Sequence, residues 1–279
     1  MTTAFVATLN RTFGALLDGL LLPFDRLAPI AGLATVSVLV AIGVLLAFKA
    51  TSDQERIRAI KRLMQAGLFE MRLFSDDPRT ILQAQVDILR AMLIYLRLSA
   101  ISLLWVILPL TLVTAHLQSH YGYQGLNPGG SALVKVQMRP GSEDQARSLA
   151  LDLPSGLRAE TPMIWSPAFR EAAWRITADR DGDYVLRVAL GSARFTKTVL
   201  VSNVVGRRSP IRLEPGILNQ LLYPSEPPLP VDAPISSIAV TYARGYVPVF
   251  GWDVHWLIAF PILLLGEVQL LKHHFKVTF

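Results

Sequence analysis

The chain has 279 residues, of which 52% are hydrophobic and only 17% charged, and its mean hydropathy is positive. This balance predicts a membrane protein with one soluble portion and argues against a soluble enzyme of two domains. The sequence contains no cysteine, which excludes disulfides, zinc fingers and thiol catalysis. Its net charge of +6 does not indicate a nucleic-acid partner, because the Lys and Arg residues form no basic face with interleaved aromatic residues. The lipid bilayer, with its anionic headgroups, is the expected partner.

Residues 1–28 predict an amphipathic segment before the first long apolar run. Its apolar residues recur at three- and four-residue spacing, which is typical of a helix with one apolar face. They are Phe5, Leu9, Phe13, Leu16, Leu17, Leu20, Leu21 and Phe24. Two interpretations stay open: the helix lies in the outer interface of the membrane, or it packs on the protein's own helices within the bilayer. We expect no cleavable signal peptide, so the first span should stay in the mature protein.

Three apolar runs predict transmembrane helices. Leu27 to Phe48 carries no charged residue. Leu98 to Leu117 contains His116 as its only ionisable side chain. Trp252 to Leu271 closes the chain. At about 1.5 Å of rise per residue, each run is long enough to cross a hydrocarbon core of roughly 30 Å. We therefore expect spans at 29–49, 98–117 and 251–272.

The segment 50–97 between the first two spans predicts a helical hairpin. Ser75-Asp76-Asp77-Pro78 should separate its two helices, because Pro78 disfavours helical geometry at Asp77. Apolar residues recur at helical spacing on both sides of that break. The expected stripe comprises Ile57, Ile60, Met64, Leu68 and Met71, then Ile81, Val86, Ile88, Leu89, Met92, Leu93 and Leu96. Such a hairpin either receives a partner or only connects the spans, and the sequence leaves both interpretations open.

Basic residues predict that the hairpin lies in the cytoplasm. An excess of Lys and Arg in short connections marks the inner face of a membrane. The hairpin and its flank hold Lys49, Arg56, Arg58, Lys61, Arg62, Arg72, Arg79, Arg90 and Arg97. Lys272 and Lys276 follow the third span in the same way, so the tail 273–279 should also be cytoplasmic. The N-terminus and residues 118–250 are then extracytoplasmic, in a multi-pass protein of the cell membrane.

Residues 118–250 predict an all-β extracytoplasmic domain with a proline-rich connection. Short runs with strand character alternate with Gly and Pro, which is typical of a β-sandwich. The expected strands are Ala132–Met138, Leu149–Leu153, Trp174–Ala178, Tyr184–Leu190, Arg194–Ser202 and Ile238–Tyr242. Val205 to Pro234 should run over the surface of the domain, with a short helix over Gly216–Leu222.

One local pattern favours an immunoglobulin-like sandwich over another small β fold. The run from Asp181 to Leu186 resembles the corner that opens strand F of immunoglobulin-like domains. There a tyrosine, here Tyr184, comes two residues before a core position, here Leu186. Trp165 or Trp174 is the expected core tryptophan.

Glu267 is the residue that points most directly to function, because a carboxylate inside an apolar span is costly and rare. Arg97 enters the second span at a comparable depth, so the two residues either form a structural ion pair or line a polar groove open to the cytoplasm. Pro109 lies inside the second span, where it removes a backbone hydrogen bond and favours a kink. These three residues form the predicted groove.

Catalytic and metal sites are not expected. The sequence has no P-loop, no G-x-G-x-x-G, no H-E-x-x-H and no G-x-S-x-G. His116, His120 and His255 lack carboxylate or thiolate companions at ligand spacing, so we expect no metal site. We predict a protein that is not an enzyme and uses no cofactor.

The order of these elements resembles the three-helix core of the Oxa/YidC superfamily of membrane protein insertases. The resemblance covers residues 27–117 and 252–273 and rests on the first span, the charged hairpin from Thr51 to Pro78, and the second and third spans. Its members include an insertase-complex subunit and a transmembrane coiled-coil protein of the endoplasmic reticulum. They hold a polar groove that is open to the cytoplasm and the lipid, and their hairpin receives substrate or ribosome. A domain of residues 118–250 between the second and third spans distinguishes this chain, because that connection is usually short in the family.

Two functions follow from the sequence. The first is an insertase-like membrane chaperone that handles client membrane proteins through its spans and hairpin. The second is a scaffold of the cell envelope, or an accessory subunit of a membrane complex, that recognises a fixed partner through its β domain. A polar cavity between the spans favours the first function, whereas tightly packed spans and an apolar patch on the β domain favour the second.

Overall fold

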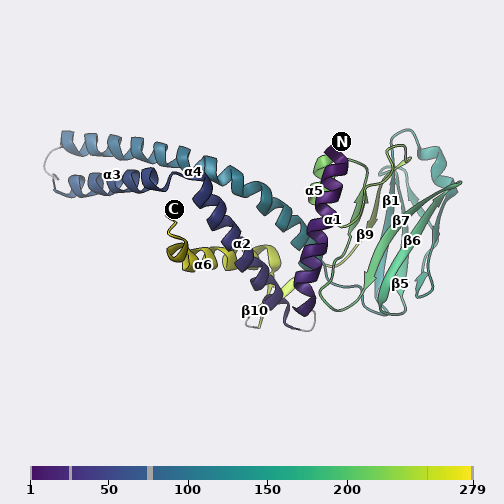
Figure 1. Ribbon diagram of the computed structural model, residues 1–279. Helices are drawn as coiled ribbons and strands as arrows, with labels where there is room; N and C mark the ends of the chain where they lie inside the picture. Colours follow the sequence, from purple (N-terminus) through teal and green to yellow (C-terminus); the bar gives the residue numbers. More distant parts are fainter. Residues whose placement is uncertain (1, 25–26, 74–77, 250, 278–279) are drawn as a thin grey trace. The chain divides into compact units, whose positions relative to one another are not determined.

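The computed structural model describes residues 2–24, 27–73, 78–249 and 251–277. The chain divides into two compact units. The first, here the β unit, comprises Met1–Leu33 and Leu112–Ala259, and the second, here the helical unit, comprises Ala34–Thr111 and Phe260–Phe279. Figure 1 shows the elements of both units with their labels.

Four helices of the described residues are long and apolar enough to cross a membrane. They are α1 (Thr2–Leu21), α2 (Pro29–Thr51), α4 (Pro78–Tyr121) and α6 (Trp256–Phe275). The three predicted apolar runs are therefore confirmed as long apolar helices, and α1 meets the same criteria of length and composition. The chain leaves α1 through a short 3-10 helix, η1 (Leu22–Phe24).

The third apolar run begins later than predicted. The expected helix from Trp252 is wrong over its first four residues, which form β11 (Trp252–His255) and pair antiparallel with β10 (Tyr246–Val249). The two strands make a separate ribbon, and α6 begins directly after it. Strand pairing gives the backbone N–H and C=O groups of this segment their hydrogen-bond partners. Trp252 and His255 are therefore part of the ribbon, opposite Val249 and Tyr246.

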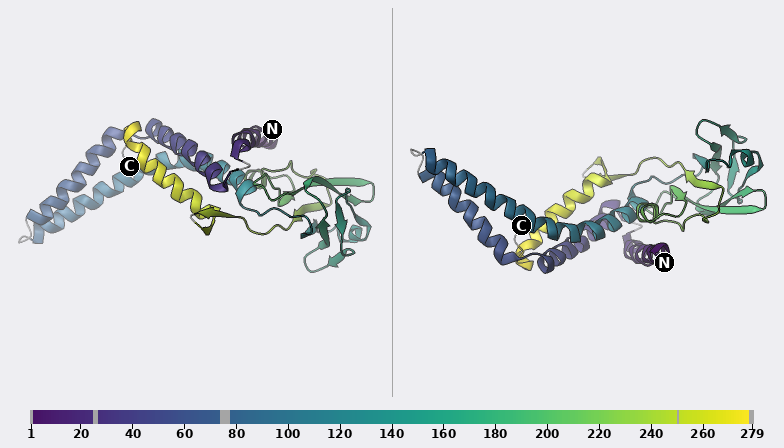
Figure 2. Two further views of the ribbon diagram at one scale, coloured as in Figure 1. Left: turned by 90° about the horizontal axis from the view of Figure 1, so that it is seen from below. Right: turned by 90° about the horizontal axis from the view of Figure 1, so that it is seen from above.

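The hairpin consists of α3 (Gln54–Leu73) and the first half of α4, which run side by side in both views of Figure 2. Their seam uses small residues: Gly67 on α3 and Ala84 and Ala91 on α4 are buried. A Cβ atom at Gly67 would lie 2.7 Å from Cγ1 of Ile88, which shows how closely the helices approach. The residues between the helices, 74–77, lie outside the described part of the chain, and with them most of the predicted Ser75–Pro78 break.

The seam corrects part of the predicted apolar stripe. Buried or half-buried positions alternate at three and four residues along both helices, as in a coiled coil. They are Ile57, Ile60, Met64, Gly67 and Met71 on α3, and Ile81, Ala84, Ile88, Ala91, Tyr95, Leu98 and Ser102 on α4. Several larger residues that the sequence placed in the stripe are exposed instead: Leu68, Val86, Leu89, Met92, Leu93 and Leu96. Small residues take their place because they allow close contact between helix backbones.

The strands of the β unit form two larger antiparallel sheets. One sheet has the order β3-β5-β1-β9-β8, with β4 paired to β5, and the other has the order β2-β6-β7. Their bounds are β1 Ser131–Met138, β2 Leu149–Asp152, β3 Leu157–Ala159, β4 Ile164–Ser166, β5 Glu171–Ala178, β6 Gly182–Leu190, β7 Ala193–Val201, β8 Ile211–Leu213 and β9 Ile235–Val240. Two short helices, η2 (Glu143–Ser148) and α5 (Ile217–Leu222), complete the unit.

Both sheets contribute side chains to shared cores, so the unit is built as a sandwich. One core cluster joins Val136 of β1 and Trp174 of β5 to Val188 of β6 and Phe195 of β7. All six predicted strands and the short helix are confirmed. The additional strands β3, β4 and β8 have three residues each, which is too short for an alternating pattern to appear in the sequence.

The predicted tyrosine pattern has a definite geometry. The Tyr184 hydroxyl, at the start of β6, donates a hydrogen bond to the backbone carbonyl of Arg180 at 2.9 Å. Leu186, two residues later, is completely buried in the core. Trp174 is also buried, whereas Trp165 is half-buried at the edge of the same core, so Trp174 is the core tryptophan.

Helix α1 packs on α5 within the β unit, as Figure 1 shows. Asn10 of α1 donates a hydrogen bond from Nδ2 to the carbonyl of Gln220 at 2.6 Å, and both side chains are buried. Neither interpretation of residues 1–28 in the sequence anticipated this contact. The helix therefore packs one of its faces against the rest of the β unit.

Candidate functional site

The helical unit contains a buried carboxyl oxygen without a partner. Glu267 lies on α6 and is half-buried, and its Oε2 atom is buried with no hydrogen bond. The hydroxyl of Ser37, on α2, faces this carboxyl group. The two groups interact, but neither the Ser37 hydroxyl nor Oε2 of Glu267 has a partner at full hydrogen-bonding geometry among the described residues. Their hydrogen-bonding capacity is therefore only partly used.

Helix α4 adds two more such groups. The hydroxyls of Ser99 and Ser102 are buried and make no hydrogen bond. A helical serine usually bonds the carbonyl four residues earlier, and Ser52 does so with Phe48 at the end of α2. We call Ser37, Ser99, Ser102 and Glu267 the unpartnered set. Three apolar helices thus each contribute a polar group, and leaving one buried and unsatisfied costs about 1–3 kcal/mol.

The three residues of the predicted groove differ in exposure: Glu267 is half-buried, whereas Arg97 and Pro109 are exposed. Arg97 is exposed on α4, and among the residues that the structure describes no ion pair joins it to Glu267. Pro109 is also exposed, and α4 continues through it as an α-helix. Arg97 precedes the seam residue Leu98 by one position, which turns its side chain away from the neighbouring helix. The sequence analysis missed the serines, although Ser102 continues the three-four spacing of the seam.

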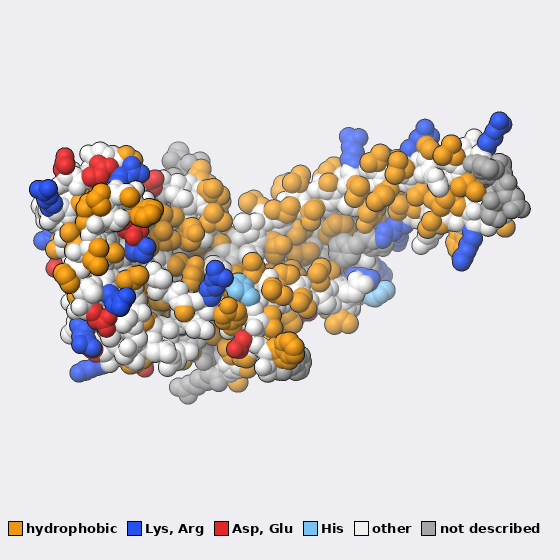
Figure 3. All heavy atoms as spheres, turned by 180° about the vertical axis from the view of Figure 1, so that it is seen from behind, with side chains coloured by type: hydrophobic (Ala, Val, Ile, Leu, Met, Phe, Trp, Pro, Cys, Tyr) orange, Lys and Arg blue, Asp and Glu red, His pale blue; other side chains and the backbone are white. Residues whose placement is uncertain are grey.

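The hairpin has an exposed apolar stripe. Five large residues on α4 recur at alternating four- and three-residue spacing and are each at least two-fifths exposed. They are Leu82, Val86, Leu89, Leu93 and Leu96. On the face drawn in Figure 3, hydrophobic side chains run along the described part of the hairpin, with Lys and Arg side chains at its margins. A continuous apolar surface of this kind marks a site for a partner or for lipid.

A second polar network joins α1 to the end of α4 within the β unit. His120, buried near the end of α4, places Nε2 at 2.8 Å from Oδ1 of Asp18 on α1. Arg207 reaches the other oxygen of the same carboxylate at 3.4 Å. One turn earlier, His116 places Nε2 at 3.2 Å from the carbonyl of Asn10. These contacts orient α1 on the β unit.

The network does not form a metal centre. The described residues contain no group of three or more His, Cys, Asp or Glu side chains that could hold a metal ion. His255 lies apart in β11, where its ring contacts Tyr246 edge-on.

The β unit also contains a largely buried ion pair. Lys197 of β7 is fully buried, and its Nζ atom lies 2.7 Å from Oε2 of Glu226. Glu226 accepts further hydrogen bonds from the Thr198 amide, the Thr198 hydroxyl and the Ser209 hydroxyl. Burial raises the pKa of the Glu226 carboxyl, but the Lys197 charge and these hydrogen bonds lower it by more, so its pKa lies below the usual 4.5. This pair fastens the proline-rich connection to the sheet.

Comparison with family models, with curated proteins and with solved structures found no match to this chain.

Proposed function

We propose that the protein is an integral membrane, insertase-like chaperone that holds client transmembrane segments while they enter the bilayer. The observation that carries the proposal is the unpartnered set on three apolar helices. Hydrocarbon offers no hydrogen bonds, so buried hydroxyl and carboxyl groups are stable there only with a partner. A polar residue or an unpaired backbone group of a client segment would supply that partner.

The exposed stripe of the hairpin provides the second part of the proposal. Large apolar residues at helical spacing form the kind of surface onto which an apolar or amphipathic helix docks. We assign the stripe as the first contact for a client in the cytoplasm. The basic residues of the hairpin favour that location, because Lys and Arg are enriched in cytoplasmic connections.

The extracytoplasmic placement of the β unit, and an immunoglobulin-like fold for its sandwich, belong to the same proposal. Support comes from the strand order, since β3-β5-β1 beside β2-β6-β7 corresponds to strands D-E-B and C-F-G of that fold. The hydrogen bond from Tyr184 to the Arg180 carbonyl matches the tyrosine corner. In this correspondence β9, late in the chain, occupies the place of the first strand.

A second candidate function, a scaffold or accessory subunit with one fixed partner, is favoured by a patch on the β unit. Ile164 of β4 and Phe169 of the following turn are 62% and 71% exposed. They lie in β4 and in the turn that joins β4 to β5, and neither side chain belongs to a core cluster of the β unit. A partner subunit bound there would bury both side chains.

Photocrosslinking in native membranes separates the two functions. A photoreactive residue at Leu89, on the exposed stripe, should capture newly made membrane proteins of several sizes. The matched control is Ala84, which is 2% exposed on the seam of the same helix and should capture none of them. Recovery at Leu89 of a single partner in fixed stoichiometry, with no newly made chains, contradicts the chaperone proposal. A photoreactive residue at Phe169 that captures that same partner supports the scaffold.

A further inference from the structure

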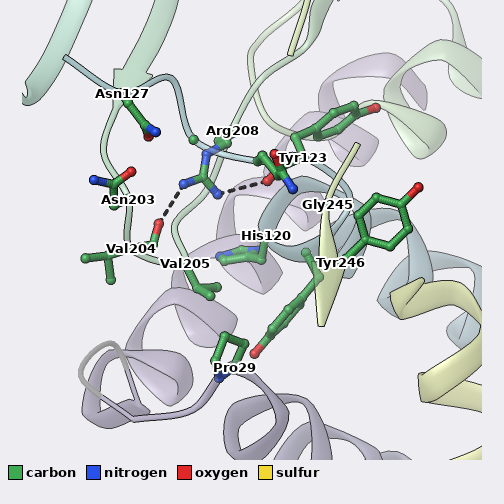
Figure 4. Close-up of a pocket in the computed structure, with 13 residues that line it drawn as sticks. Pro29, His120, Tyr123, Asn127, Asn203, Val204, Val205, Arg208, Gly245 and Tyr246 are labelled. Carbon is green, nitrogen blue, oxygen red and sulfur yellow. Dashed lines mark hydrogen bonds between the residues drawn. The ribbon is translucent and has the colours of Figure 1, made fainter. Parts of the chain in front are cut away.

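The β unit contains a cavity of about 250 Å³ whose walls are polar. Figure 4 shows Arg208 in it, with Asn127, Asn203 and Val204 on one side and Tyr123, His120 and Tyr246 on the other. None of the 13 lining residues drawn there is acidic. The cavity is therefore lined with hydrogen-bond donors and one permanent positive charge.

Arg208 is a buried cation that lacks a counter-ion. Arg208 is only 3% exposed, and its guanidinium donates hydrogen bonds to four backbone carbonyls. These are the carbonyls of Tyr123, Ser202, Val204 and Gly206. Its Nε atom has no partner, and among the described residues no carboxylate pairs with it. Burial lowers the pKa of the Arg208 guanidinium, yet an arginine keeps its charge in proteins.

The neighbouring groups do not neutralise this charge. The Asp18 carboxylate is already shared, with one oxygen on His120 and the other on Arg207. His120 also places Nδ1 at 3.0 Å from the carbonyl of His116, so both of its ring nitrogens face acceptors. Tyr242 interacts with Arg208, but burial raises the pKa of its hydroxyl to about 12, so the hydroxyl is neutral at pH 7. The positive charge is left for an external anion.

We infer that this cavity binds a phosphate group. Arg208 supplies the charge, and the side-chain amides of Asn127 and Asn203, which line the same cavity, offer further donors. A guanidinium that is weakly hydrated and fixed in position is the usual protein partner of phosphate oxygens. A cavity of 250 Å³ exceeds the volume of about 30 Å³ that a single water occupies in the liquid.

The phosphate comes either from a lipid headgroup or from a free phosphate compound. Lining residues adjoin apolar helices in the sequence: Pro29 begins α2, Tyr121 ends α4, and Tyr246 begins the ribbon that precedes α6. Lipid headgroups lie at the level where membrane helices end. The site itself is independent of the proposed function, because it requires no client segment.

The test uses the purified full chain and two variants of equal charge. Asn203→Asp places a carboxylate at the exposed rim of the cavity, where it repels phosphate and offers Arg208 a counter-ion. Gln145→Glu adds the same charge at an exposed position of η2 outside the lining and serves as the control. Circular dichroism verifies that each variant is folded.

Binding is measured by native mass spectrometry and by thermal stabilisation, with three probes: vesicles of phosphatidylcholine, the same vesicles with phosphatidic acid, and inorganic phosphate in detergent. We expect phosphate-dependent binding for the parent chain and Gln145→Glu, and binding at least about tenfold weaker for Asn203→Asp. Binding of phosphatidic acid alone identifies a headgroup site, and binding of inorganic phosphate identifies a site for free phosphate. Equal binding by Asn203→Asp and Gln145→Glu, or no binding of either probe by the parent chain, overturns the inference.

Discussion

Two carboxyl groups in this chain show how differently its two units treat buried polar atoms. Glu226 in the β unit accepts hydrogen bonds from an ammonium group, a backbone amide and two hydroxyls. Glu267 in the helical unit has an oxygen that is buried and accepts none, beside a serine whose hydroxyl is equally unused. The β unit completes its own network around the carboxylate. The helical unit leaves Oε2 of Glu267 without a partner at hydrogen-bonding geometry among the described residues, which is the capacity that the proposed function assigns to a client segment.

The largest expected effect concerns the completed network. Glu226→Gln leaves the Lys197 ammonium buried without a counter-charge, and breaking a buried pair in this way costs about 3–5 kcal/mol. Hydrogen exchange of β7 amides in the full chain measures the loss. Asp232→Asn, at an exposed carboxylate of the same unit, is the control and should change stability by less than about 0.5 kcal/mol. Similar exchange in both variants would mean that the pair does not hold the sheet.

Acid should weaken the same network. Because the folded-state pKa of Glu226 lies below its unfolded value of 4.5, the carboxylate contributes its full stability above about pH 5. That contribution is lost as the pH falls through the folded-state pKa. Chemical unfolding of the β unit at pH 7, 5 and 3 should show the decline. The loss of unfolding free energy with falling pH should be smaller in Glu226→Gln than in the parent chain. An equal loss in the two proteins would mean that other titrating groups cause it.

A smaller effect is expected at the hairpin seam. Gly67→Leu forces a side chain into Ile88, and overpacking of this kind costs about 1–3 kcal/mol. Ala66→Leu places the same side chain at the adjacent exposed position and is the matched control. Faster hydrogen exchange in α3 and α4 should appear only in Gly67→Leu. If Ala66→Leu loosens the hairpin as much, the close approach at Gly67 is not what holds the two helices.

The smallest effect on stability is expected at Glu267. Replacing an unsatisfied buried polar group by an apolar one is neutral or stabilising. Glu267→Leu should therefore keep or raise the thermal stability of the helical unit in lipid nanodiscs. A loss comparable to that of Glu226→Gln would show that Glu267 has a structural partner, and the contrast between the two carboxyls would fail.

The sequence predicted what depends on local patterns. Glu267 was recognisable because a charge within an apolar run is conspicuous, and strands β1, β5, β6 and β7 because each holds eight or nine residues, enough to alternate. The seam of the hairpin was harder, since periodicity selects the largest apolar residues, whereas close packing used Gly67, Ala84 and Ala91. Trp252 was assigned to a helix because aromatic residues often begin a span, and pairing with β10 overrode that preference.

Long-range pairs carried no sequence signal. Lys197 and Glu226 are 29 positions apart, and Asp18 and His120 are 102 apart. Each looks like an ordinary surface residue in the sequence, and only the folded chain brings the partners together. Ser37 was likewise missed, because a single hydroxyl in an apolar run is common and its meaning depends on the carboxyl group beside it.

Insertion of a short client membrane protein into liposomes that contain the purified full chain tests the central claim most directly. The comparison is between the parent chain, Glu267→Leu, and Leu265→Ala as a control at an exposed position of α6. We expect Glu267→Leu to be as stable as the parent but to insert the client more slowly, by up to about tenfold, since a hydrogen bond contributes about 0.5–1.5 kcal/mol. Insertion by Glu267→Leu at the parental rate would contradict the account.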